Sequence, residues 1–232
     1  MSEYDHGESH RQLTSGWFRA GVFGASDGLV TNISLILGFA GANPGHSVVR
    51  LAGLAGLVAG GFSMASGEWV SVRAQKESLE YEIEVERRSL EASPGEEREE
   101  LKGLFVSRGI DAELADRLAT DLMRDPDLAL RTHAREELGV DPSATGSPWA
   151  AATSSFVAFC IGALIPLLPW LFTTSGSDAV WSIVLGAVAS LIFGGAIGWF
   201  IRRGTVRWAL RQLLVTTLAA AVTFGVGRLV GS

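Results

Sequence analysis

Apolar residues in this chain gather in five long stretches that carry almost no charge. A helix needs about 20 mainly apolar residues to cross a bilayer, and each stretch reaches or approaches that length once arginine and tryptophan side chains at its ends are counted. The pattern therefore predicts membrane-spanning helices. Two lie between residues 17 and 76 and three between residues 149 and 230, with expected spans at 17–42, from about 48, 149–172, 179–201 and about 208–230.

A charged block separates the second expected span from the third. Residues 77–141 hold 19 Asp and Glu against 9 Lys and Arg. Their apolar residues are sparse but recur at helical intervals, as at Leu114, Leu118 and Leu122, which favours a small helical bundle over disorder. We therefore predict an all-α polytopic membrane protein in which an acidic helical domain, residues 77–141, is inserted between the second and third of five transmembrane helices.

Helix boundaries around this block follow from Gly, Pro and capping residues. No Gly or Pro occurs between Gly67 and Pro94, so one helix is expected to leave the membrane and continue into water. Ser93, with a glutamate three residues later, predicts a capping box at the start of the next helix. Asp111 is the expected N-cap of the helix after that, and residues 128–138 are expected to form the last helix of the block.

Basic residues are unevenly distributed between the loops that join the apolar spans. The loop at residues 173–178 has no base, whereas the loop before the last span holds four arginines, Arg202, Arg203, Arg207 and Arg211. By the positive-inside rule the arginine loop is cytoplasmic. With five spans, the N-terminus and the acidic domain are then also cytoplasmic and the C-terminus is outside, an orientation that one arginine near the C-terminus slightly opposes.

The N-terminal residues bear on targeting and metal binding, and the cysteine bears on disulfide formation. Residues 1–16 have no apolar stretch of the kind that a cleaved signal peptide has, and we expect them to form a disordered arm. His6 and His10 in this arm could touch a metal loosely, although a solvated terminus is the favoured interpretation. The single cysteine, Cys160, excludes an intrachain disulfide.

Three residues in or beside the first two spans are candidates for a membrane pathway. Asp27 lies within an apolar span, where a charged side chain costs at least about 2.5–3.5 kcal/mol and usually faces a bundle interior or a water-filled path. Met64 and Glu68 are one helical turn apart and share a face of the second helix. The alternatives are that Asp27 bonds to a neighbouring helix or sits near an interface, that Met64 only packs, and that Glu68 is an interfacial acid.

Acidic residues one helical turn apart make the charged block a candidate cation site. Residues with this spacing include Glu82 and Glu86, the row Glu77, Glu80 and Glu84, Glu97 and Glu100, and His133 and Glu137. Like charges at this spacing weaken an isolated helix, and a bound cation would offset them. Carboxylates with one imidazole favour Fe²⁺ or Mn²⁺ ahead of Zn²⁺. The alternative is a solvated charged face, balanced in part by Arg87, Arg88, Arg98 and Lys102.

Five segments of the chain resemble, in the same order, segments of the vacuolar iron transporter family. They read FGASDGLVTNISLILGFAGA, GGFSMASGEWVSVRAQKE, HAREELG, SPWAAATSSFVAFCIGALIPLLP and RQLLVTTLAAAVTFGVGRLVG. The similarity covers nearly the whole chain from Gly16 onward, so only the N-terminal arm falls outside it.

The resemblance implies a homodimer of five-span subunits that exports Fe²⁺ or Mn²⁺ from the cytosol in exchange for protons. It also implies a path lined by the first spans at the dimer centre and a cytoplasmic three-helix metal-binding domain. Asp27 matches the family's first-span acid and Met64 its second-span methionine. The positions that match the family's metal-binding glutamates are Glu86, Glu97, Glu100 and Glu137.

Three positions depart from the family pattern. Ser89 stands where a further glutamate is expected, and His133 stands where plant members have a methionine. Gly56 occupies a position where plant members carry an acid, and Glu68 could take its place. The short arm and compact loops look bacterial, so the expected location is a bacterial plasma membrane.

The resulting hypothesis is a secondary transporter in which the acidic domain gathers Fe²⁺ or Mn²⁺ and passes it to Glu68, Asp27 and Met64. The expected partners are divalent metal ions, protons, membrane lipid and a second copy of the chain; no nucleic acid and no prosthetic group are expected. The alternative is a membrane-anchored metal sensor or buffer without transport. Such an anchor would not need an acid within a membrane span, as Asp27 is. An enzyme of the di-iron type is disfavoured because such sites use a pair of Glu-x-x-His motifs on facing helices. The sequence has a single match, Glu3–His6, and it lies in the N-terminal arm.

Overall fold

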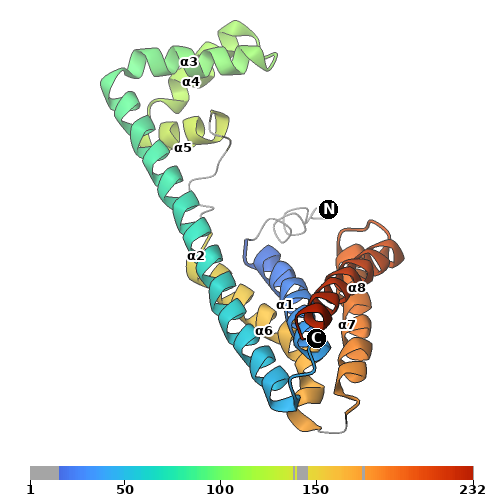
Figure 1. Cartoon of the computed structure of the whole chain (residues 1–232). Helices are drawn as coiled ribbons and strands as arrows, with labels where there is room; N and C mark the ends of the chain where they lie inside the picture. Colours follow the sequence, from blue (N-terminus) through green and yellow to red (C-terminus); the bar gives the residue numbers. More distant parts are fainter. Residues whose placement is uncertain (1–15, 138, 140–145, 174–175, 232) are drawn as a thin grey trace, which may run out of the picture. The chain divides into compact units, whose positions relative to one another are not determined.

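The computed structural model describes residues 16–137, 139, 146–173 and 176–231. Over these residues the regular structure is entirely α-helical, which confirms the predicted class (Figure 1). The predicted arm, residues 1–16, lies outside the described residues except for Gly16, which begins the first helix. The helices are α1 Gly16–Gly41, α2 His46–Ala92, α3 Pro94–Ser107, α4 Ala112–Leu122, α5 Pro126–Glu136, α6 Pro148–Phe172, α7 Asp178–Phe200 and α8 Thr205–Val230.

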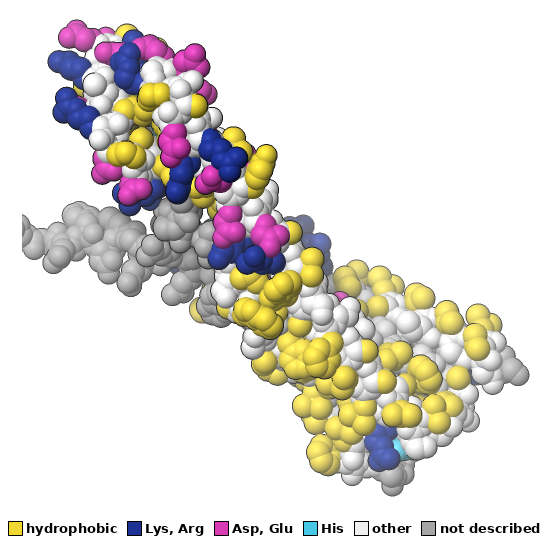
Figure 2. Space-filling model, turned by 90° about the vertical axis from the view of Figure 1, so that its left-hand side faces the viewer, with side chains coloured by type: hydrophobic (Ala, Val, Ile, Leu, Met, Phe, Trp, Pro, Cys, Tyr) yellow, Lys and Arg dark blue, Asp and Glu magenta, His cyan; other side chains and the backbone are white. Residues whose placement is uncertain are grey.

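The chain divides into two compact units. The first, called here the membrane unit, comprises the described residues up to Ser71 and from Ser147 onward; the second, the acidic unit, comprises Val72–Gly146. The acidic unit is slightly wider than the charged block at 77–141 because it includes five residues on either side of the block. Charged side chains gather on the acidic unit, and hydrophobic side chains cover the membrane unit (Figure 2).

Five helices are long and apolar enough to cross a membrane, namely α1, α2, α6, α7 and α8. This result confirms the five predicted spans. Helix α2 has 47 residues and runs without interruption from the apolar stretch into the charged block, as the absence of Gly and Pro after Gly67 predicted. It therefore contributes its first part to the membrane unit and its last part to the acidic unit.

Helices α1 and α6 approach each other so closely that their backbones touch. A Cβ atom added at Gly28 would lie 2.1 Å from the carbonyl oxygen of Phe159, and one added at Gly162 would lie 2.1 Å from that of Ala25. Only glycine permits this approach. Glycines of the first span therefore serve a contact within the chain.

Helix α2 packs in a different way: side chains of α1 and α6 lie against its glycine residues. The ring of Phe159 lies over Gly60, where an added Cβ would come within 2.3 Å of its Cζ atom. Near the start of α2, Val49 packs in a buried cluster with Ile36 of α1 and Leu167 of α6. The glycines of α2 thus also serve packing within the chain.

Contacts between these helices fix their directions. The starts of α1 and α6 pack together at Gly21 and Ser154, so these two helices are parallel, and Gly38 against Thr223 places α8 parallel to them. Helix α7 is antiparallel to α8, because Gly198 near its end meets Thr205 at the start of α8. One end of the membrane unit, called here the arginine end, therefore holds the α7–α8 corner and the points where the chain leaves and re-enters the unit.

In the acidic unit, aspartate side chains cap two helices. Asp111 accepts hydrogen bonds from the backbone N–H groups of Glu113 and Leu114, which confirms it as the N-cap of α4. Asp125 caps α5 in the same way, and α5 therefore begins at Pro126, two residues before the predicted start at residue 128.

The predicted capping box at Ser93 is wrong. Ser93 is the N-cap residue of α3, but its side chain makes no capping hydrogen bond. In a capping box, the hydroxyl oxygen of Ser93 would accept a hydrogen bond from the backbone N–H group of Glu96. This N–H group instead donates to the backbone carbonyl of Ser93, at 2.9 Å. Helix α3 then packs Leu101 and Phe105 against Ala115 and Ala119 of α4.

Candidate metal centre

Four potential metal ligands from three helices come together in the acidic unit. Glu86 lies near the end of α2, Glu97 in the first turn of α3, His133 in the last turn of α5, and Glu137 at its C-cap. One ligand atom from each residue lies within 4.8 Å of the corresponding atom of every other one. The group offers three carboxylates and one imidazole.

Local sequence explains how these residues meet. The chain breaks at Ser93–Pro94, so α3 turns back from the end of α2 and brings Glu97 toward Glu86 (Figure 1). His133 and Glu137 are four residues apart and share one face of the α5 end. Two chain segments distant in sequence thereby supply ligands to one point.

His133 is fully buried and held by backbone carbonyls. Its Nδ1 lies 3.0 Å from the carbonyl oxygen of Ala129, and its Nε2 lies 3.3 Å from that of Glu97. A neutral imidazole has one N–H donor, and both carbonyls are acceptors. A proton on Nδ1, where the contact is shorter, would leave the Nε2 lone pair on the side of Glu97. This is the arrangement in which a histidine binds a metal while its other nitrogen is fixed by a hydrogen bond.

Glu86 carries a buried oxygen that lacks a hydrogen-bond partner. Its Oε1 atom is shielded from solvent and bonds to no described group. Burial raises the pKa of Glu86; the charge of His133 opposes this effect, and the charges of Glu97 and Glu100 add to it. A buried carboxylate oxygen without a partner destabilises the folded protein, so a proton or a cation bound to this atom would be stabilising.

The pKa of Glu137 is also raised, and by a large amount. Although part of this residue is exposed, desolvation of its carboxyl group, followed by repulsion from Glu86 and Glu100, raises its pKa to about 7. The group therefore holds a proton part of the time at neutral pH. A divalent cation that binds here would displace that proton, because metal ligands must be deprotonated.

Two predicted ligands lie outside the four-residue group. Glu100 is exposed on α3 and acts on the group through its charge, which raises the pKa values of Glu86 and Glu137. Glu82 is exposed on α2, one turn before Glu86. In each predicted glutamate pair, one member joins the group and the other does not.

Three of the four basic residues expected to balance the charged face pair with acids of the charged block, although with none of the four metal-ligand residues. Arg88 pairs with Glu84 on its own helix. Arg98 and Lys102 both pair with Asp116 of α4, at 2.8 and 3.0 Å, and these bonds hold the pKa of the Asp116 carboxyl below its usual range. Sequence spacing did not single out Asp116, which ties α3 to α4. These ion pairs stabilise the unit beside the metal-ligand group without neutralising it.

The predicted pathway residues lie in the membrane unit. Asp27 is exposed on α1, where its carboxylate accepts a hydrogen bond from Thr31 at 3.4 Å. Met64 and Glu68 are half-buried on α2, one turn apart.

Comparison with known proteins agrees with this architecture. The family model described as the VIT family matches residues 18–228. The chain is 38% identical to a protein named "Vacuolar iron transporter" from Acanthamoeba castellanii, over 95% of this chain and 82% of that protein. It is 30% identical to "Vacuolar iron transporter 1" of Eucalyptus grandis, over 98% of this chain and 91% of that protein, and 30% identical to "Vacuolar iron transporter 1" of Arabidopsis thaliana, over 90% and 84%. Because the family model spans nearly the whole chain and these relatives align along most of their length, the chain belongs to the VIT family.

Proposed function

We propose that this protein is a secondary transporter that exports Fe²⁺, Mn²⁺ or both from the cytosol in exchange for protons. Membership of the VIT family and the names of its relatives support metal-ion transport at the coarser level. The five candidate spans support a membrane location, and transport rather than catalysis agrees with what the relatives are named for.

The observation that carries the proposal is the group formed by Glu86, Glu97, His133 and Glu137. Three carboxylate oxygens and one imidazole nitrogen suit Fe²⁺ and Mn²⁺ and also admit Zn²⁺. The unpaired Oε1 of Glu86 and the buried Nε2 of His133 are the atoms that a cation would satisfy. In the proposal, this group gathers the ion before it enters the membrane path, and Glu100 attracts it by charge.

Proton exchange is supported by the electrostatics of the same group. Glu137 has a pKa of about 7, so it gains a proton readily once the metal leaves. Carboxylates in a membrane path follow the same principle, because low polarity favours the neutral form. Protons and metal ions would thus compete for the same oxygens along the route.

The membrane path is proposed to run past Glu68, Asp27 and Met64 at the interface of a homodimer. Asp27 sits on an exposed stripe of α1 that also includes Phe23 and Thr31. A carboxylate on such a face cannot lie against lipid without a large cost. The apolar windows of α2 and α8 are 17% and 11% buried, against 44% for α1, so both helices have surface that a second subunit could cover.

The proposed orientation is supported by the arginine end of the membrane unit. The four arginines between residues 202 and 211 lie at the same end as the chain's exit toward the acidic unit. The positive-inside rule places this end in the cytosol, together with the N-terminus and the acidic unit. The proposed location is the plasma membrane of a bacterium, with the C-terminus outside.

A flux measurement tests the proposal. The protein is reconstituted into proteoliposomes with a pH-sensitive dye, and uptake of Fe²⁺, Mn²⁺ and Zn²⁺ is measured for the parent, Asp27→Ala and the control Phe23→Leu, one turn earlier on the same face. We expect metal flux with opposite proton movement in the parent and the control, and none in Asp27→Ala. Normal flux in Asp27→Ala would refute the assigned path, and metal binding without flux in the parent would favour the membrane-anchored buffer.

A further inference from the structure

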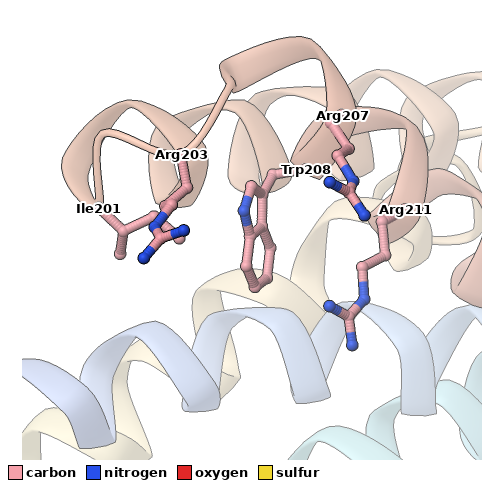
Figure 3. Close-up of a pocket in the computed structure, with 5 residues that line it drawn as sticks. All are labelled: Ile201, Arg203, Arg207, Trp208 and Arg211. Atoms are coloured by element: carbon pink, nitrogen blue, oxygen red, sulfur yellow. The ribbon is translucent and has the colours of Figure 1, made fainter.

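The corner between α7 and α8 forms a hollow of about 520 Å³ at the arginine end of the membrane unit. Its lining residues are Ile201, Arg203, Arg207, Trp208 and Arg211. Figure 3 shows the indole ring of Trp208 between Arg203 on one side and Arg207 and Arg211 on the other. The guanidinium group of Arg211 lies 5.0 Å from the centre of that ring. An aromatic ring and three positive charges therefore share one hollow.

Among the described residues, no acid pairs with the arginines of this hollow. The chain has no Asp or Glu after Asp178, whereas five arginines follow it. Three guanidinium groups held together without a counter-charge repel one another, so an anion would stabilise them.

The start of α8 adds to the positive potential. Its N-cap is Gly204, at φ +82°, and this residue provides no side-chain acceptor for the N–H groups of the first turn. Free N–H groups and the helix dipole at the start of a 26-residue helix favour an anion. Guanidinium groups bind phosphate oxygens in pairs, with geometry that suits phosphate particularly well.

Apolar surface adjoins the same turns of α8. Val206, Leu210 and Leu214 form a stripe at four-residue spacing, with 71%, 56% and 60% of their surface exposed. A soluble phosphate would have no use for this stripe, whereas an acyl chain would cover it. A lipid with a phosphate headgroup matches both features at once.

We propose that this hollow binds the phosphate headgroup of an anionic phospholipid, with an acyl chain lying along Val206, Leu210 and Leu214. Arg203, Arg207 and Arg211 hold the phosphate, and Trp208 lies at the boundary between headgroup and chain, where tryptophan is favoured. The site is separate from the metal-ligand group and needs no metal.

Lipid titration of the full-length protein in detergent micelles, followed by native mass spectrometry, tests the site. The probes are phosphatidylglycerol, phosphatidylcholine and soluble glycerol phosphate. The variant is Arg207→Gln/Arg211→Gln, and its charge-matched control is Arg50→Gln/Arg228→Gln, which lies toward the opposite end of the unit. Each arginine near an anionic phosphate is worth a factor of about five, so we expect about 30-fold weaker phosphatidylglycerol binding in the variant and no loss in the control.

Three results would overturn the proposal: equal binding of phosphatidylcholine by the parent, equal losses in both double variants, or glycerol phosphate binding as tight as that of the lipid. A further variant, Arg207→Lys/Arg211→Lys, keeps the charge but removes the paired donors, and we expect it to bind with intermediate affinity. Thermal unfolding without added lipid checks that each variant is folded. Since no readout involves metal flux, failure of this proposal is distinct from failure of the transport proposal.

Discussion

Nε2 of the buried His133 lies 3.9 Å from Oε2 of Glu97, although the two residues are 36 positions apart. This contact joins the last turn of α5 to the first turn of α3. It places the lone pair of a fixed imidazole beside a carboxylate, with Glu86 and Glu137 completing the group. A metal ion at this point would link α2, α3 and α5, so binding and the stability of the acidic unit are coupled.

Replacing His133 tests the ligand role directly. We expect His133→Gln to weaken binding of Mn²⁺ and of anaerobic Fe²⁺ by at least about tenfold, since even the loss of groups behind a metal ligand has effects of that size. Calorimetric titration of the purified full-length protein measures the affinity. The control is Glu82→Gln, at an exposed glutamate outside the group. Equal affinities in the two variants would show that His133 does not bind the metal.

Glu86 is expected to show opposite effects with and without metal. Glu86→Gln removes a carboxylate whose Oε1 is buried without a partner, so the metal-free protein should be as stable as the parent or more stable. The same change should abolish most of the rise in melting temperature that Mn²⁺ produces. Thermal unfolding with and without Mn²⁺ measures both effects. A variant that loses stability without metal and keeps the full metal-induced rise would contradict the assignment.

Glu137 makes the stability of the metal-free protein depend on pH. Its pKa is raised from 4.5 to about 7, so the folded protein holds this proton more tightly than the unfolded chain. Its contribution is therefore fully present below pH about 4.5 and is lost as the pH rises through about 7. Glu137→Gln should flatten the decline in melting temperature between pH 5 and 8, whereas Glu113→Gln, at an exposed carboxylate of α4, should leave it unchanged.

Metal affinity should follow the reverse trend with pH. Because a cation must displace the Glu137 proton, binding of Mn²⁺ should strengthen as the pH rises from 6 to 8 and should release protons into the buffer. Calorimetry in two buffers of different ionisation enthalpy counts those protons. The same proton count in Glu137→Gln as in the parent would mean that another group supplies them.

The close contact of α1 and α6 predicts a sharp difference between two glycine substitutions. Gly28→Ala would place a methyl group 2.1 Å from the carbonyl oxygen of Phe159, so the backbones must separate. We expect a loss of at least about 1–3 kcal/mol, typical of an overpacked core. Gly225→Ala in α8, where the added atom meets nothing within 4 Å, should be neutral or stabilising. Thermal unfolding in detergent compares the two; similar melting temperatures would contradict the packing described.

Features that depend on neighbouring residues could be read from the sequence. Uncharged apolar length predicted the five spans, and the lack of Gly and Pro predicted the unbroken α2. Asp111 was predicted as a cap because its side chain reaches N–H groups only two and three residues away. Each of these properties is set within a few turns of helix, where the chain has little choice of geometry.

Features that depend on how helices meet required the tertiary structure. Spacing proposed both members of each glutamate pair as ligands, and only the turn at Ser93–Pro94 and the position of α5 selected Glu86 and Glu97 over Glu82 and Glu100. The sequence does not say which surface Gly28 meets, and the structure shows that it packs against Phe159 of α6. The hollow at Trp208 also depended on the antiparallel pairing of α7 and α8. The reason is the same in each case: helical spacing fixes which residues share a face, but the partner of that face is fixed by the angles and distances between helices.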